Sequence, residues 1–262
     1  MPNVTVEGAR VEYTRAGAGP DLLLLHSLLT DATVFERVLP ALEGARRVTC
    51  LNLPGFAGSQ PRELETVADY ADHVAQAMLA LDLARATTVF GNGFGAFVAL
   101  ELAIRHGDRF GPLVVADVVA AFPEAARAPF RGMAERVRAG GMAAVLDTAI
   151  GRMFPPAFQA QAPDVVAYRK SRLALADAGG FARACLALAA LDLRPRLPSI
   201  RNRTLVMCGA LDQTTPPALA REVAQAIPRA EYRDIPGSGH CPMLEQPEAL
   251  ADALLGWVGR HA

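Results

Sequence analysis

Two residue types that can cooperate in proton transfer stand just beyond predicted strands in the final part of the chain. Asp212 follows the apolar run Thr204–Gly209, and His240 lies in a Gly-Ser-Gly-His loop after Glu231–Ile235. A carboxylate that orients an imidazole makes that imidazole an effective general base. A lone aspartate shortly before Thr-Thr-Pro is more often a turn or helix-capping residue. The glycine-rich loop that holds His240 beyond a strand favours the catalytic interpretation.

A third motif has the pattern of a nucleophile turn but lacks the nucleophile. The strand candidate Thr87–Gly91 leads into Gly-Asn-Gly-Phe-Gly and then into a helical pattern. In G-x-S-x-G turns the outer glycines let strand and helix pack closely, and the central residue projects its side chain into the site. The central residue here is Gly93, which has no side chain. Loss of the nucleophile in a serine triad costs roughly six orders of magnitude in turnover, so an acyl-enzyme on residue 93 is excluded.

Glycines after a strand can also admit a dinucleotide at a helix N-terminus. The turn around Gly93 follows the fifth strand candidate and does not have the G-x-G-x-x-G spacing. We therefore expect no bound cofactor. The four cysteines lie far apart with no C-x-x-C spacing, which predicts neither a metal site nor disulfides.

Charge and hydropathy restrict the class of partner. The 26 basic and 27 acidic residues give a formal net charge of -1, and no basic run is present. This argues against binding to nucleic acid or to an anionic membrane. No apolar stretch reaches the roughly 18 residues of a membrane span, and the first residues do not read as a signal peptide. We expect a cytoplasmic protein that acts on a small, weakly charged molecule. The sequence is compatible with a homodimer.

The elements that position these motifs alternate between short apolar runs and longer helical patterns. This alternation predicts a mostly parallel eight-stranded sheet with helices on both faces. Expected strands are Val4–Val6, Arg10–Tyr13, Leu22–His26, Arg47–Asn52, Thr87–Gly91, Leu113–Asp117, Thr204–Gly209 and Glu231–Ile235. Expected helices are Thr33–Leu42, Val67–Leu81, Phe94–Arg105, Pro217–Ala226 and Pro247–Val258.

Between residues 120 and 200 the alternation stops, and an alanine-rich helical pattern takes over. We interpret residues 1–119 and 201–262 as one core domain and residues 120–200 as a helical insertion. The large apolar residues of the insertion could line a pocket as a group, although each one alone is more often ordinary core. They are Phe122, Phe130, Met133, Met142, Met153, Phe154, Phe158 and Phe181.

With these motifs in this order, the chain resembles the α/β-hydrolase superfamily over nearly its whole length. Gly93, Asp212 and His240 stand in the order nucleophile, acid, histidine. The segment 25–31 lies where the family has its oxyanion loop, and its His-Ser-Leu is similar to the Asn-Ser-Leu-Gly of 3-oxoadipate enol-lactonases. The segment 52–59 resembles the D-x-x-G-x-G-x-S turn, with Asn52 and Ala57 as departures. The Gly-His-x-Pro-x-x-Glu-x-Pro ending is shared with many carbon–carbon bond hydrolases, esterases and lyases.

The resemblance implies roles for several residues. His240 would be the base, Asp212 would orient it, and the backbone N–H groups of Leu28 and Phe94 would form the oxyanion hole. Residues 120–200 would be the cap of an α/β-hydrolase fold. For substrate contacts we expect six further residues, namely Ser27, Asn92, Asp117, Phe122, Met153 and Phe154.

Four interpretations fit a family member without its nucleophile. In the first, His240 deprotonates a water beside Gly93, and the water hydrolyses a small carboxylic ester, lactone or vinylogous ketone. In the second, His240 moves a substrate proton in a lyase, an isomerase or a cofactor-free oxygenase. The third is a binding module that no longer catalyses, and the fourth is a serine hydrolase inactivated by an engineered glycine. The retained acid and histidine favour an enzyme over a binding module. Among the enzymes, we favour a hydrolase over a lyase.

Overall fold

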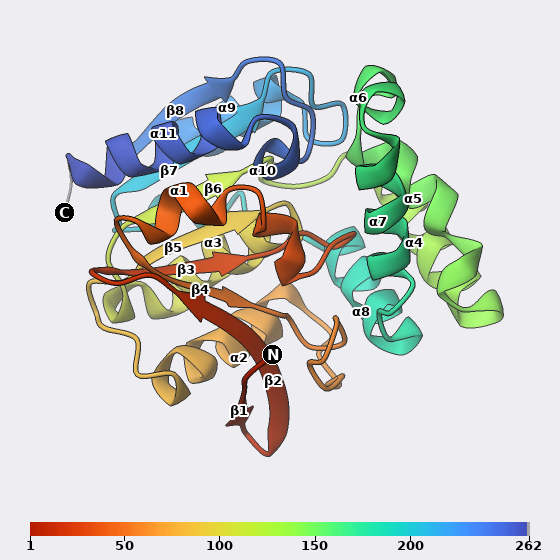
Figure 1. Ribbon diagram of the computed structural model, residues 1–262, viewed down its shortest axis with the longest axis horizontal. Helices are drawn as coiled ribbons and strands as arrows, with labels where there is room; N and C mark the ends of the chain where they lie inside the picture. Colours follow the sequence, from red (N-terminus) through yellow and green to blue (C-terminus); the bar gives the residue numbers. More distant parts are fainter. Residues whose placement is uncertain (261–262) are drawn as a thin grey trace.

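The computed structural model describes residues 1–260 and contains one eight-stranded sheet in the order β1-β2-β4-β3-β5-β6-β7-β8. β1 and β2 are antiparallel to each other, β2 is antiparallel to β4, and the remaining pairs are parallel. The sheet is therefore the mostly parallel one that the sequence predicts (Figure 1). The strands are β1 (Asn3–Val6), β2 (Ala9–Ala16), β3 (Asp21–Leu25), β4 (Arg47–Leu51), β5 (Thr88–Asn92), β6 (Leu113–Ala116), β7 (Thr204–Gly209) and β8 (Ala230–Ile235).

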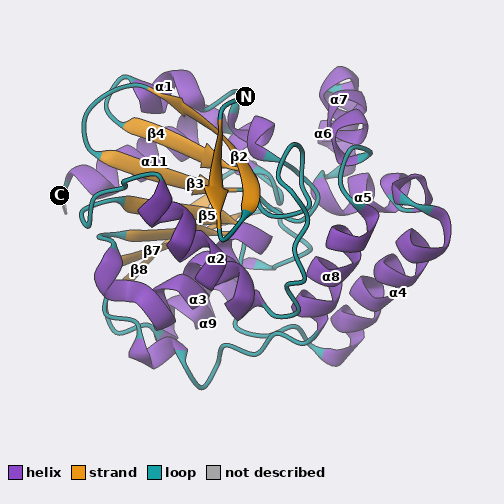
Figure 2. Cartoon of the chain, turned by 90° about the horizontal axis from the view of Figure 1, so that it is seen from below, coloured by secondary structure: helices purple, strands orange, loops and turns teal. Residues whose placement is uncertain are grey.

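The central strands β3, β5, β6 and β7 are buried at every position. Parallel strands covered on both faces have this continuous apolar character. Figure 2 shows α1 and α11 on one side of the sheet and α2 and α3 on the other. The helices around the sheet are α1 (Leu39–Glu43), α2 (Val67–Ala80), α3 (Phe94–His106), α9 (Pro217–Ala226), α10 (Pro242–Glu245) and α11 (Pro247–Gly259).

One expected helix is wrong. Instead of a continuous helix over Thr33–Leu42, the chain forms a 3-10 turn at Ala32–Phe35 and then the short α1. Pro40 has no N–H to donate to the preceding turn, so it is suited to the first turn of a helix and not to its interior. The side chain of Asp31 caps the 3-10 turn by accepting from the Thr33 N–H at 3.1 Å.

Between β6 and β7 lie five α-helices, which we call the helical layer. Figure 1 shows them together at the right, beyond one end of the strands and apart from the helices that cover the faces of the sheet. Their side chains and the loops after the parallel strands line a common cavity, which places the layer over the carboxyl edge of the sheet. None of the described helices is long and apolar enough to cross a membrane. The layer consists of α4 (Glu124–Gly140), α5 (Leu146–Met153), α6 (Pro156–Gln161), α7 (Pro163–Leu173) and α8 (Ala178–Ala189).

An ion pair ties the helical layer to the loop that follows β3. Arg172 on α7 bonds to the buried carboxylate of Asp31 with a 2.6 Å contact, and Arg169 approaches the same carboxylate at 3.8 Å. Burial alone would raise the pKa of Asp31, but its bond from Thr33 and the charge of Arg172 outweigh burial and lower it. The carboxylate therefore stays ionised and links the two parts.

The departure at Asn52 from the family pattern has a local cause. The Asn52 side-chain oxygen accepts from the Ala32 N–H at 2.7 Å, and its amide donates to Glu12 at 2.8 Å. A carboxylate at this position would face that of Glu12 and could not donate to it. Asparagine therefore fits this buried site where an aspartate would be repelled.

Candidate active site

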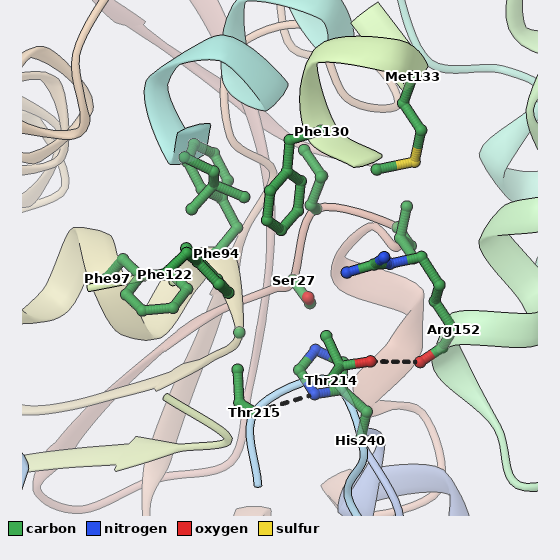
Figure 3. Close-up of a pocket in the computed structure, with 14 residues that line it drawn as sticks. Ser27, Phe94, Phe97, Phe122, Phe130, Met133, Arg152, Thr214, Thr215 and His240 are labelled. Atoms are coloured by element: carbon green, nitrogen blue, oxygen red, sulfur yellow. Dashed lines mark hydrogen bonds between the residues drawn. The ribbon is translucent and has the colours of Figure 1, made fainter. Parts of the chain in front are cut away.

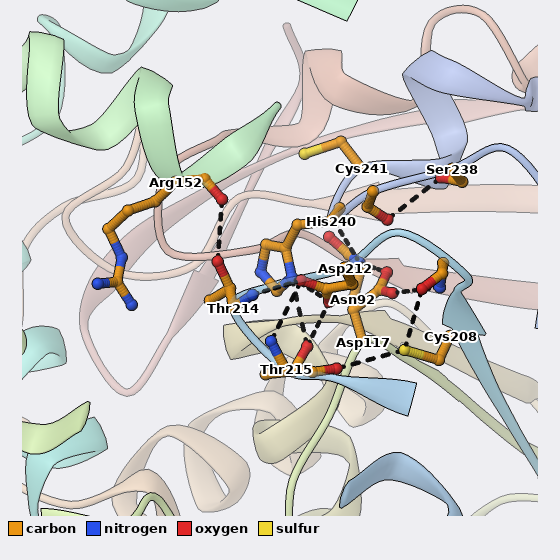
Figure 4. Close-up of polar contacts among 12 residues, drawn as sticks. Asn92, Asp117, Arg152, Cys208, Asp212, Thr214, Thr215, Ser238, His240 and Cys241 are labelled. Carbon is orange, nitrogen blue, oxygen red and sulfur yellow. Dashed lines mark hydrogen bonds and ion pairs between the residues drawn. The ribbon is translucent and has the colours of Figure 1, made fainter. Parts of the chain in front are cut away.

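Asp212 and His240 form a buried hydrogen-bonded pair beyond the carboxyl ends of β7 and β8 (Figure 4). His240 Nδ1 lies 2.8 Å from Asp212 Oδ2. The other carboxylate oxygen accepts from the backbone N–H groups of Thr214 at 2.7 Å and Thr215 at 3.2 Å. Asp212 thus serves both as a turn aspartate and as the partner of His240. Its bond fixes the proton on Nδ1 and leaves Nε2 free to accept one.

The loop that carries His240 is held by Glu245. One carboxylate oxygen accepts from the Gly239 N–H at 2.7 Å and the other from the Cys241 N–H at 2.9 Å. The Asn92 side chain donates to the His240 carbonyl at 3.3 Å. The glutamate of the Gly-His-x-Pro-x-x-Glu motif therefore clamps the backbone on both sides of the histidine.

The turn between β5 and α3 has the strained geometry of a nucleophile elbow. Gly93 has φ +52° and ψ −116°, a conformation that side chains disfavour. A β-carbon on Gly91 would collide with the Gly95 carbonyl, and one on Gly95 would collide with the Leu25 carbonyl. The outer glycines are thus required by close backbone packing.

The imidazole of His240 faces the elbow. A β-carbon on Gly93 would lie 3.2 Å from His240 Nε2 and would overlap with the Ser27 hydroxyl. The free imidazole nitrogen therefore borders the space in which the side chain of a nucleophile would begin.

A small cavity with about 380 Å³ of free space opens between the elbow and the helical layer (Figure 3). Its wall is mostly apolar, with polar groups from the loops at one end. The lining residues are Ser27, Leu28, Leu29, Gly93, Phe94, Phe97, Phe122, Phe130, Met133, Arg152, Leu188, Thr214, Thr215 and His240.

The cavity contains only some of the residues expected from the sequence. Met153 and Phe154 line a neighbouring groove, which shares Arg152, Thr214 and His240 with the cavity. Arg152 is not among the residues expected from the sequence, because an arginine on an amphipathic helix usually faces solvent.

A sequence model described as the alpha/beta hydrolase fold matches residues 20–247. The chain belongs to this family. It is 28% identical to 3-oxoadipate enol-lactonase 2 of Acinetobacter baylyi, with 96% of this chain and 94% of that protein covered. It is 30% identical to polyketide synthase ThaQ of Burkholderia thailandensis over 96% of this chain, which spans only 12% of ThaQ.

A thermophilic esterase from Thermogutta terrifontis has a similar structure, with a TM-score of 0.91 and 27% identity. The match covers 100% of this chain and 99% of that one. The chain is therefore an α/β-fold hydrolase related to enol-lactonases and esterases.

Two backbone donors of this α/β-hydrolase border the cavity. Leu28 and Phe94 both line it, and within residues 1–260 neither N–H group donates to a protein acceptor. Unpaired N–H groups at such a position can stabilise negative charge that develops on a substrate oxygen.

Asn92 and Asp117 lie behind the Asp212–His240 pair and not on the cavity wall. Asn92 donates to Asp117 at 2.7 Å, and the Gly209 N–H donates to the other Asp117 oxygen at 2.8 Å. Burial, followed by the charge of Asp212, raises the pKa of Asp117. This placement makes the two residues a support for the β7 and His240 loops.

Among residues 1–260, the group close enough to be considered as metal ligands is Asp117, Asp212 and His240, with candidate ligand atoms within 4.8 Å of one another. Both oxygens of each carboxylate already accept N–H or O–H donors. This donor set is that of a hydrogen-bond network and does not fit a metal cage.

Cys241 adjoins His240 but does not substitute for the nucleophile. Its thiol is buried and is absent from the cavity wall. Burial raises its pKa well above the ordinary range. A thiol with a raised pKa is seldom ionised and is therefore a poor nucleophile.

The pKa of His240 predicts how activity depends on pH. Burial lowers this pKa, but the charge and hydrogen bond of Asp212 outweigh burial and raise it above 6.5. Only the neutral imidazole accepts a proton, so kcat/KM should rise with pH and level off only when the pH exceeds this raised pKa of about 9. In Asp212→Asn the imidazolium loses its charged partner, which lowers the pKa of His240. The rising part of the kcat/KM profile should therefore move to lower pH, and the plateau value of kcat/KM should fall. A pH profile with p-nitrophenyl acetate measures both effects, and a rising part that does not move contradicts this assignment.

Proposed function

We propose that this protein hydrolyses small carboxylic esters or lactones, or a vinylogous ketone, by general-base catalysis with water as the nucleophile. The observation that carries the proposal is the preformed Asp212–His240 pair, whose free Nε2 lies 3.2 Å from the β-carbon position of residue 93. That position has no side chain, so a water can be activated where the family has a serine. The helical layer would serve as the cap.

The steps balance without a covalent intermediate. His240 Nε2 takes one proton from the water as the water oxygen bonds to the carbonyl carbon. The N–H groups of Leu28 and Phe94 hold the resulting oxyanion. When the bond to the leaving oxygen breaks, the imidazolium returns the proton to that oxygen. Asp212 stabilises the imidazolium between the two transfers.

Arg152 favours a substrate that carries a negative charge. Its guanidinium points into the cavity in Figure 3, lies over the Phe130 ring with Cζ 5.2 Å from the ring centre, and makes no ion pair with any described residue. Burial lowers its pKa, yet an arginine retains its charge in proteins. A half-buried cation without a counter-ion is stabilised by an anionic ligand. Because of Arg152, we propose a small ester or lactone that carries a carboxylate, in place of the weakly charged substrate expected from the composition.

Arg152→Gln should therefore raise KM for an anionic ester more than for a neutral one. For monomethyl glutarate we expect an increase of about 10- to 100-fold, the effect of losing a charged hydrogen bond. For methyl valerate, which has no carboxylate, KM should change little. Steady-state hydrolysis followed by acid release measures both esters. The control Arg138→Gln removes an exposed arginine of α4, and equal effects of Arg152→Gln on the two esters would refute an anion site.

A further inference from the structure

The hydroxyl of Ser27 takes the place of the missing elbow side chain. Ser27 follows β3, and its Oγ overlaps the position of a β-carbon on Gly93, while its own β-carbon lies 3.0 Å from that position. A serine at residue 93 and Ser27 in this rotamer could not coexist. Any side chain at residue 93 would therefore require the Ser27 hydroxyl to turn away from its present position.

Ser27 Oγ and His240 Nε2 border the same small space, and each lacks a hydrogen-bond partner among residues 1–260. Their separation cannot exceed the sum of their distances to the β-carbon position of residue 93. A water that bonds to both groups spans up to about 5.6 Å, so the two groups are not too far apart for one water to bond to both. No hydrogen bond connects the two groups directly, so His240 is not placed to deprotonate the Ser27 hydroxyl itself.

The backbone of Ser27 is held firmly. Its carbonyl accepts from the Thr30 N–H at 3.2 Å, from the Thr30 hydroxyl at 3.1 Å and from His26 Nδ1 at 2.8 Å. His26 Nε2 in turn accepts from the Leu53 N–H at 3.0 Å. Because the loop backbone is fixed on both sides, the β-carbon of Ser27 is held beside the elbow in a defined position.

We propose that Ser27 is a catalytic residue whose hydroxyl binds the water that His240 deprotonates. This inference rests on the proposed function. The water donates one hydrogen to Nε2 and the other to Ser27 Oγ, so that its remaining lone pair faces the substrate carbonyl. The first hydrogen moves to His240 as the carbon–oxygen bond forms, and Ser27 forms no covalent bond at any step.

Removing the hydroxyl should slow the chemical step without weakening binding. We expect Ser27→Ala to lower kcat for p-nitrophenyl acetate about tenfold, the effect of one lost hydrogen bond, with KM nearly unchanged. Ser27→Thr keeps the hydroxyl and should recover most of kcat. The control Ser59→Ala removes a serine that is equally buried, at 4% exposure for each, but lies outside the cavity, and should leave kcat unchanged. An unaltered kcat in folded Ser27→Ala would overturn the inference.

Mass spectrometry after treatment with a fluorophosphonate separates water binding from covalent catalysis. We expect no adduct on Ser27 of the unmodified protein, and an adduct there would overturn the inference by making Ser27 a nucleophile. The double variant Ser27→Gly/Gly93→Ser returns the hydroxyl to the elbow and should gain an adduct on residue 93. A His240→Gln variant that retains turnover contradicts the proposed function. If His240→Gln loses turnover but Ser27→Ala does not, only the role of Ser27 is contradicted.

Discussion

The variant His240→Gln should lose about 10² to 10⁴-fold in kcat for p-nitrophenyl acetate, the usual contribution of a general base. Glutamine preserves much of the volume and can still hydrogen bond to Asp212, but its amide cannot take a proton from water. Since Nε2 is the free base at the elbow, no neighbouring group replaces it. KM should change little, because the apolar cavity wall is unaltered.

The matched control is His106→Gln. His106 Nε2 lies 2.7 Å from Asp72 Oδ1, away from the cavity, so replacing His106 should leave turnover intact. Turnover that survives His240→Gln would refute the general-base mechanism. If the unmodified protein binds esters and lactones but turns none over, the binding-module interpretation gains support.

Gly93→Ala should lower kcat by roughly 10²-fold and also destabilise the fold. The methyl group would lie 3.2 Å from His240 Nε2 and would push the Ser27 hydroxyl aside, and displacement of reacting groups by about 1 Å can cost this much. A side chain at φ +52° adds about 1–2 kcal/mol of backbone strain. Kinetics with p-nitrophenyl acetate and urea unfolding measure the two effects separately.

Gly256→Ala provides the control for Gly93→Ala. An added β-carbon at Gly256, inside α11, meets nothing within 4 Å, and the change should stabilise the helix by up to about 1 kcal/mol. If Gly93→Ala instead leaves kcat and unfolding unchanged, the space beside the elbow has no role.

Gly93→Ser distinguishes a working glycine from an inactivated serine enzyme. A serine has the same steric and backbone cost as the alanine, and we therefore expect the native activity to fall. An increase in ester hydrolysis by orders of magnitude, with an acyl adduct on residue 93, would show instead that the chain is a serine hydrolase lacking only its hydroxyl.

Much of the fold and the positions of Asp212 and His240 could be predicted from local sequence. Continuous apolar runs predict buried parallel strands, and residues just beyond such strands must meet at one sheet edge. For this reason Asp212 and His240 could be paired from their positions alone. Glycine spacing likewise predicted the elbow around Gly93, since close backbone packing tolerates no β-carbon there.

The packing of the helical layer could not be predicted in this way. Helical periodicity shows which residues of a helix are apolar, but not which neighbouring segment they face. The sequence placed Met153 and Phe154 in the pocket, whereas packing of the layer puts them on the adjacent groove and turns Arg152 of the same helix into the cavity.

The sequence by itself determined where the strands lie along the chain, the glycine turn around Gly93, and the positions of Asp212 and His240 just beyond two strands, because each of these depends on a pattern within a few consecutive residues. The tertiary structure alone decided which charged group lines the cavity and which side chains border the empty position at Gly93. Ser27 and Gly93 are 66 positions apart in the chain, and Arg152 belongs to a third segment. Only the packing of the β3 loop, the elbow and the helical layer brings their atoms together, and no local pattern encodes these distances.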